Sequence, residues 1–270
     1  MSIHRGLSLR FCSLPTVAEI AQAIAEKTHP EATPDWDPVG LQLGDPETEV
    51  DSIAVCHEVT DDVVAHLVGA PVDLLVTYHP LLFTPTNRIL AGRSAGARSY
   101  RLISAGITLL VTHTDFDAAP GGMAESLASF FELRDIQEFG GDEASNLAAI
   151  GRWGHFEGSL GTIDAMLTDV FGPIGMRITG DRRTQVDTVA VVPGSGESFI
   201  EAAAEVAQVL VTGDVSHHRA VTARDLGLAI ADPGHVATER PGMSALLTLV
   251  AETSGLDVVD LTGIDPQTWE

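Results

Sequence analysis

Histidines and carboxylates follow four predicted strands of this chain, each group just past the C-terminal end of its strand. In an open α/β sheet, ligands bind at that edge, because the strand ends and the following loops converge there. Nitrogen and oxygen donors without sulfur suit a divalent Zn, Fe, Mn or Co ion. The pattern therefore predicts one or two divalent metal ions per chain. The residues are His79 after "DLLVT"; His113, Asp115 and Asp117 after "ITLLV"; Asp214, His217 and His218 after "QVLVTG"; and His235 and Glu239 after "GLAIADPG".

Each of these residues also has a simpler interpretation when it is taken alone. His79 could be a packed residue with one hydrogen bond, and Asp117 could cap a helix or hold a turn. Glu239 could stabilise the N-terminal end of its helix, and His217 and His218 could face solvent. The convergence of four segments favours the metal site. The other histidines show no such convergence, and we interpret them as surface or packing residues: His4, His29, His57, His66 and His155.

The predicted elements alternate between apolar strands and helices, as in βα units on a mainly parallel sheet. A capping box formed by Thr16 and Glu19 begins the first helix, and further helices are expected at about 61–68, 99–105 and 122–131. A polar stretch near 129–145 indicates a domain boundary or a long loop. A helix at about 238–253 and a last strand end the chain. The predicted fold class is therefore α/β, with mixed, mainly parallel sheets. The predicted strands are "SIAVC", "DLLVT", "ITLLVT", "NLAAIGRW", "GMRITG", "DTVAVV", "QVLVTG", "GLAIAD" and "LDVVDL".

The composition limits the partners and the location of the protein. Thirty-eight acidic residues against 15 basic ones give a net charge of -23, which repels a phosphate backbone and argues against nucleic-acid binding. No apolar run approaches the roughly 20 residues that a membrane helix needs, and the N-terminus lacks a sustained apolar segment. We therefore expect a cytoplasmic protein without a membrane partner. Cys12 and Cys56 lack the spacing of a thiolate metal site, and we expect both in the core.

Two further segments carry open alternatives. "PGSGES", residues 193–198, could cradle a phosphate with its backbone amides, but it lacks the ending of a P-loop, and an ordinary βα turn is the favoured interpretation. "DWDPVGLQLGDP", residues 35–46, is either an ordered loop packed on the body or a lid on the site. The sequence has no GxSxG motif, and neither cysteine has a suitable histidine partner, so nucleophilic catalysis is disfavoured.

Five motifs occur in order between residues 35 and 239: "DWDPVGLQLGDP", "YHPLLF", "HTDFDAAPGGMAESLA", "TGDVSHHRA" and "DPGHVATE". Together they strongly resemble the GTP cyclohydrolase 1 type 2 homologs, also called NGG-interacting-factor-three-like proteins, in the short form without an inserted domain. The resemblance implies two α/β domains with a dinuclear divalent metal site in the cleft between them. It implies a first domain of residues 1–130 plus 236–270, a second of residues 131–235, and a homohexamer built as a trimer of dimers.

The resemblance also assigns metal ligands by position. His79 matches the second histidine of the family's usual "HHP" motif, and Asp117 matches the family's bridging aspartate. His235 and Glu239 match the histidine and the glutamate of "GHxxTE". Tyr78 stands where many members have the first histidine, and a neutral phenol is a poor ligand at pH 7 unless a bound cation lowers its pKa. We therefore expect one ion at His79, Asp117 and Glu239, and we leave open a second ion at His235, the shared carboxylates and Tyr78.

The function predicted from these residues is that of a metal-dependent hydrolase acting on a nucleotide or another phosphate-containing small molecule, with GTP ring opening as the named candidate. A metal-bound water would supply the nucleophile, and His113 and His218 are the candidates for acid/base catalysis. The alternative is a non-catalytic metal-binding or interaction scaffold that forms a ring-shaped oligomer. A phosphate-ester hydrolase would differ from the first prediction only in its substrate.

Overall fold

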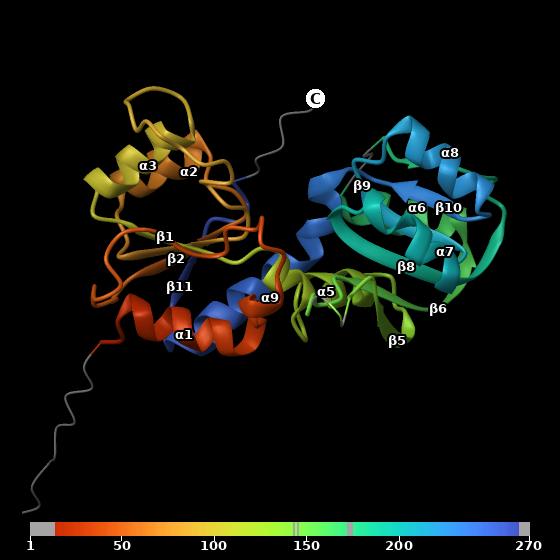
Figure 1. Cartoon of the computed structure of the whole chain (residues 1–270), viewed down its shortest axis with the longest axis horizontal. Helices are drawn as coiled ribbons and strands as arrows, with labels where there is room; N and C mark the ends of the chain where they lie inside the picture. Colours follow the sequence, from red (N-terminus) through yellow and green to blue (C-terminus); the bar gives the residue numbers. More distant parts are fainter. Residues whose placement is uncertain (1–13, 143, 145, 172–174, 265–270) are drawn as a thin grey trace, which may run out of the picture.

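The computed structural model describes residues 14–142, 144, 146–171 and 175–264, and it contains two β-sheets with helices on their faces (Figure 1). Cys12 and His4 lie outside the described residues. The first sheet has the strand order β1-β4-β3-β2-β11. Its strands pair in parallel, except that β1 runs antiparallel to β4. The bounds are β1 Gly40–Leu43, β2 Ile53–Cys56, β3 Leu74–Thr77, β4 Thr108–Val111 and β11 Val258–Asp260.

Helices cover both faces of the first sheet, which is why its central strands are continuous apolar runs. On one face, Val63 of α2 and Leu102 of α3 pack with Leu75 and Leu109 of the sheet. On the other face, helices α1 and α9 bury their apolar side chains against β2 and β3. The predicted capping box at the start of α1 is present. The helix bounds in this half are α1 Val17–Thr28, α2 Asp61–Gly69, α3 Ala95–Ser104, α4 Thr114–Ala118 and α5 Met123–Phe130, with a short 3₁₀ turn at Pro30–Ala32.

The second sheet has the strand order β5-β6-β8-β9-β10-β7. Strands β8, β9 and β10 pair in parallel, and the outer strands β5, β6 and β7 pair antiparallel. Helices α5 and α6 pack on one face, and α7 and α8 pack on the other. The bounds are β5 Arg134–Phe139, β6 Gly151–Ser159, α6 Leu160–Phe171, β7 Arg177–Ile178, β8 Gln185–Ser195, a 3₁₀ turn η3 Glu197–Phe199, α7 Ile200–Val206, β9 Val209–Gly213, α8 His217–Asp225 and β10 Ala229–Asp232.

Helix α9 (His235–Ser254) connects the two sheets. It begins directly after β10 of the second sheet, and its residues Met243, Leu246 and Val250 belong to the core of the first half. Strand β11 then pairs with β2, so the C-terminal segment completes the first sheet. Figure 1 shows α9 between the two halves. The strands of the first sheet thus lie within residues 1–130 and 236–270, and those of the second within 131–235. The domain boundaries themselves stay a prediction.

The predicted α/β class with mixed, mainly parallel sheets is confirmed, since five of the nine strand pairings in the described residues are parallel. Part of the segment 35–46 forms edge strand β1, which was not predicted, and Trp36 from the same segment lines the cavity described below. Strand β5 and helix α6 were not predicted from the sequence pattern. Cys56 is buried as expected. In the described part of the chain, each helix is too short or too polar to cross a lipid bilayer.

Candidate metal centre

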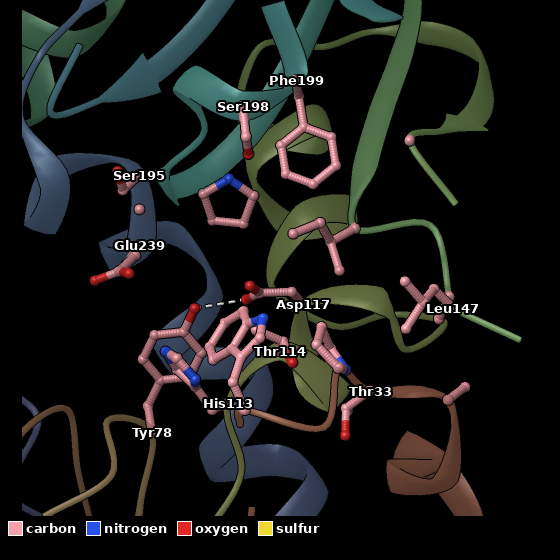
Figure 2. A pocket seen from close by; sticks show the side chains of 18 of the residues that line it. Thr33, Tyr78, His113, Thr114, Asp117, Leu147, Ser195, Ser198, Phe199 and Glu239 are labelled. Carbon is pink, nitrogen blue, oxygen red and sulfur yellow. Dashed lines mark hydrogen bonds between the residues drawn. The ribbon is translucent and has the colours of Figure 1, made fainter. Parts of the chain in front are cut away.

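A cavity of about 370 Å³ lies at the C-terminal ends of the central strands of both sheets, and both halves of the chain contribute to its walls (Figure 2). The ends of β3 and β4 bring Tyr78, His113 and Asp117, and α9 brings His235 and Glu239. The second sheet contributes the end of β8 and the turn that follows it. The remaining lining residues are Ala32, Thr33, Pro34, Trp36, Phe83, Thr114, Gly140, Leu147, Ala148, Ile150, Pro193, Gly194, Ser195, Ser198 and Phe199.

Three histidines surround the carboxylate of Glu239, which is almost fully buried. Its Oε2 lies 2.7 Å from Nε2 of His57 and 3.1 Å from Nε2 of His79. Its Oε1 lies 3.0 Å from Nε2 of His235. Burial alone would raise the pKa of Glu239, but the charge of His79 and the hydrogen bonds from the three histidines hold that pKa well below its usual value. Glu239 is therefore ionised. Its Oε2 faces His57 and His79, and its Oε1 faces His235.

His57, His79 and Glu239 form a group that could hold a divalent ion, because one donor atom from each lies within 4.8 Å of the others. Two imidazole nitrogens and one carboxylate oxygen are a donor set typical of Zn and related ions. Gly194 leaves the room that this set needs. A Cβ added to Gly194 would lie only 2.7 Å from Oε1 of Glu239, so any larger residue would crowd the carboxylate. The residues present therefore fit a metal ion. One feature differs from common metal sites: the buried Nδ1 of His57 has no hydrogen-bond partner among the described residues.

Tyr78 and Asp117 form a buried pair beside this group. The Tyr78 hydroxyl donates to Oδ1 of Asp117 across 2.5 Å, the contact that is dashed in Figure 2. Burial, together with the charges of Asp117 and Glu239, raises the pKa of Tyr78 well above its usual value, so the phenol is neutral. Burial also raises the pKa of Asp117 to about 7, with opposing contributions from His113 and Tyr78. The hydrogen bond from Tyr78 thus engages one oxygen of Asp117, the carboxylate that the motif resemblance assigns as the bridging metal ligand.

Two histidines of the cavity, His113 and His235, each contact a carboxylate through Nδ1. Nδ1 of His113 lies 2.9 Å from Oδ1 of Asp37, and the other oxygen of Asp37 accepts hydrogen bonds from the amide and the hydroxyl of Thr114. Burial would raise the pKa of Asp37, but His113 and Thr114 outweigh burial and lower it. Nδ1 of His235 lies 2.7 Å from Oδ2 of Asp214. Burial would lower the pKa of His235, but its contacts with Glu239 and Asp214 raise it to about 9.

Comparisons with known proteins identify the family and the fold of the chain. The model of the family DUF34/NIF3 (NGG1p interacting factor 3) matches residues 15–265. The chain belongs to the DUF34/NIF3 family. A protein of Streptomyces coelicolor named GTP cyclohydrolase 1 type 2 homolog is 30% identical over 94% of both chains. A Bacillus cereus protein related to NIF3 has a similar structure, with a TM-score of 0.80 and 19% identity over 96% of this chain and 100% of that one. Reduced HcgD from Methanocaldococcus jannaschii superposes with a TM-score of 0.76 and 24% identity over 92% of this chain and 98% of that one.

The family predicted from the motifs is thus confirmed, and the structure shows which of the predicted site residues meet. Tyr78, His113, Asp117, His235 and Glu239 line the cavity. His79 is not among the lining residues, but its Nε2 lies 3.1 Å from Oε2 of Glu239, and its ring centroid is 5.4 Å from those of both His113 and His235. Metal binding by these residues stays a prediction. His218 is different, because it is exposed in the first turn of α8, where its ring contacts that of His217. The structure therefore does not bring His218 to this NIF3-family cavity.

Sequence reasoning missed His57 and Asp37. We interpreted His57 as a surface or packing residue, but it is buried against Glu239 and belongs to the candidate metal group. A signal was present, because His57 directly follows β2 just as His79 follows β3, and the two strands are parallel neighbours. Asp37 lies in the segment before β1, and nothing in the spacing of that segment connects it with His113. Only the folded chain brings those two residues together.

Residues 193–195 end strand β8, and a short turn then leads through η3 into α7, which is the ordinary βα connection that the sequence favoured. The amide of Gly194 donates to Oγ1 of Thr238, and the amide of Gly196 donates to Oγ1 of Thr212. These two amides are therefore engaged within the protein and do not form a phosphate cradle. Gly194, near the end of β8, has a positive φ of 62°, and its missing side chain leaves room for Glu239 and His235.

Proposed function

We propose that this NIF3-family protein is a metal-dependent hydrolase that holds at least one divalent ion at His57, His79 and Glu239 and acts on a small molecule in the adjacent cavity. The observation that carries the proposal is the convergence of these three donors beside a cavity that Glu239 lines together with His113, Asp117 and His235. The relatives' name, GTP cyclohydrolase 1 type 2 homolog, supports a hydrolytic reaction.

The residues of the chain have separate roles in this proposal. A divalent ion bound by the group would lower the pKa of a coordinated water toward 7 and so supply hydroxide. Since Asp37 is a carboxylate and accepts from Nδ1 of His113, that nitrogen carries the proton. The Nε2 atom of His113 is then free to take or give a proton on the cavity side. His113 is therefore the acid/base residue that we propose, and Asp37 orients it.

We also propose that the chain forms a homohexamer built as a trimer of dimers, which the motif resemblance implies. Sedimentation equilibrium measures the mass of the assembly. A monomer at micromolar concentration would contradict this part of the proposal without affecting the metal site.

The metal site is tested by removing one histidine at a time. His57→Ala and His79→Ala should each lower the bound zinc per chain by roughly tenfold or more after dialysis, since each removes a ligand. His66→Ala is the matched control, because it removes an exposed imidazole on α2 outside the site. Metal content is read by elemental analysis, with circular dichroism to establish that each variant is folded. If His57→Ala and His79→Ala both hold as much metal as His66→Ala, the ligand assignment is wrong.

Turnover is tested separately on the metal-loaded protein. Incubation with GTP should release formate if the ring is opened, and incubation with 4-nitrophenyl phosphate should release phosphate if the enzyme is a phosphate-ester hydrolase. His113→Gln should retain the metal and lose turnover, which would separate catalysis from metal binding. A protein that retains its metal but releases neither product with Zn, Fe, Mn or Co would favour the non-catalytic scaffold.

A further inference from the structure

Aromatic side chains are concentrated around the cavity, and two of them, Trp36 and Phe83, are exposed. Only 14 of the 270 residues are Phe, Trp or Tyr, yet four of them line this one cavity: Trp36, Tyr78, Phe83 and Phe199. Trp36 is 60% exposed and Phe83 is 52% exposed, and their ring centroids are 6.0 Å apart in an edge-on arrangement. Leaving large apolar side chains in water is unfavourable. Covering them with a ligand would recover that free energy.

The cavity also has two chemically distinct walls. The polar wall contains the His113, Asp117, His235 and Glu239 side chains beside the metal group. Another part of the lining carries the apolar side chains of Leu147, Ile150 and Phe199, with the hydroxyl of Ser198 beside Phe199. Figure 2 shows Phe199 and Leu147 on the side of the cavity away from Tyr78 and His113. A molecule that fills the space would therefore place a polar atom at one end and an apolar body at the other.

The charges of the cavity disfavour an anionic ligand. None of the lining residues in the described part of the chain is Lys or Arg, whereas Asp117 and Glu239 are both present. Proteins normally recognise phosphate groups with Arg, Lys or free backbone amides. The buried Arg152 donates to the carbonyl oxygens of Ala118 and Ala149, so it is engaged in the structure. With a net charge of -23 on the whole chain, a triphosphate would meet repulsion at both long and short range.

Two backbone amides beside the cavity are already paired within the protein. The amides of Gly194 and Gly196 already donate to threonine hydroxyls. The start of α9 packs against Gly213, where an added Cβ would lie 2.6 Å from the amide nitrogen of His235. The imidazole of His235 is the cationic side chain of the lining, and both of its nitrogens face carboxylates, Nδ1 that of Asp214 and Nε2 that of Glu239. A bound divalent ion would therefore add the positive charge that is not already paired with a carboxylate.

From these observations we propose that the cavity binds an uncharged molecule with a flat ring, which packs against Trp36, Phe83 and Phe199 and directs one oxygen or nitrogen atom to the ion. The proposal rests on the proposed function, because it needs the ion at His57, His79 and Glu239. It narrows the substrate class from phosphate-containing molecules to uncharged, ring-bearing ones. On this basis GTP itself is a poor fit, although its base without the phosphates would match.

Three hydroxamates that share one metal-binding group test the proposal. Benzohydroxamate carries an uncharged ring, acetohydroxamate lacks the ring, and 4-carboxybenzohydroxamate adds a negative charge at the far end of the ring. Isothermal titration of the zinc-loaded protein should give a benzohydroxamate affinity roughly tenfold higher than that of either other compound, because ring burial is lost in one and a charge meets the apolar part of the lining in the other. Equal affinities for benzohydroxamate and acetohydroxamate, or stronger binding of the carboxylate compound, would overturn the proposal.

A pair of variants places the ring. Trp36→Ala should lower the affinity for benzohydroxamate by roughly fivefold and leave the affinity for acetohydroxamate unchanged. Tyr100→Ala is the matched control, because Tyr100 is an exposed aromatic residue on α3 outside the cavity. Both positions are exposed, so neither substitution should unfold the protein. If Trp36→Ala behaves like Tyr100→Ala, the ring does not lie where we propose.

Zinc content, measured before each titration, keeps the two proposals apart. A protein that binds no zinc contradicts the proposed function. A protein that binds zinc but shows no preference for the uncharged ring contradicts only the ligand class.

Discussion

The first sheet supplies most of the reactive side chains of the cavity, whereas the second sheet supplies His235, the backbone at Gly194 and apolar side chains. His57, Tyr78 and His79 follow neighbouring parallel strands of the first sheet. From the second sheet come the backbone at Gly194 and the ring of Phe199. Helix α9 begins at the second sheet and packs into the first, and it carries Glu239 between the two. The difference suggests that one half sets most of the chemistry and the other half sets the shape.

The largest effect should come from filling the space that the second sheet leaves open. Gly194→Ala forces a side chain into a residue with positive φ, which costs about 1–2 kcal/mol, and its Cβ would lie 2.7 Å from Glu239 and 3.2 Å from Nε2 of His235. We expect a lower free energy of unfolding and a loss of metal affinity of roughly tenfold or more. Urea denaturation and zinc titration measure the two quantities.

Gly227→Ala is the matched control for this change. Gly227 also has a positive φ, but an added Cβ there meets nothing within 4 Å. It should show the same backbone strain with normal zinc affinity. If both variants keep normal zinc affinity, Gly194 of the second sheet does not shape the metal site, and the proposed difference between the two halves is wrong.

A smaller effect is expected from changing the reactive half at Tyr78. Because the neutral phenol is buried and donates to Asp117, we expect one ion per chain in the native protein. Tyr78→His replaces the phenol by a further imidazole next to Asp117. This additional ligand should raise the metal content toward two ions per chain. Elemental analysis at saturating zinc measures this.

Tyr78→Phe is the control that removes the hydroxyl without adding a ligand. It should retain one ion per chain, since His57, His79 and Glu239 are unchanged. Two ions per chain in the native protein would show that Tyr78 does not prevent the second site.

The same contrast explains how much could be predicted from the sequence. Side chains at the ends of parallel strands reach one edge, so His79, His113 and Asp117 could be placed together from strand patterns alone. His57 followed the same rule and was overlooked because it was judged as an isolated histidine. The apolar part of the lining could not be predicted, because Leu147 and Phe199 are far apart in the chain and come together only through tertiary packing. Asp37 was hidden for the same reason.

The smallest expected effect is a pH dependence of stability in the metal-free protein, and it arises where the halves meet. Contacts with Glu239 and Asp214 raise the pKa of His235 from 6.5 to about 9. A raised pKa means that the folded state favours the charged imidazole. This stabilisation is complete below pH 6.5 and is lost as the pH rises through 9. The buried Asp117, whose pKa is raised to about 7, acts in the same direction, because its ionisation costs stability between pH 4 and 7.

The melting temperature of the metal-free protein should therefore fall as the pH rises from 6 to 9. Zinc should bind more tightly over the same range, because protons no longer compete for the ligands, so the stabilisation by zinc should grow with pH. His235→Gln should flatten the decline above pH 7 and leave the part due to Asp117. A native protein whose melting temperature is constant from pH 6.5 to 9 would show that α9 does not hold His235 as a cation, and the electrostatic link between the two halves would then be absent.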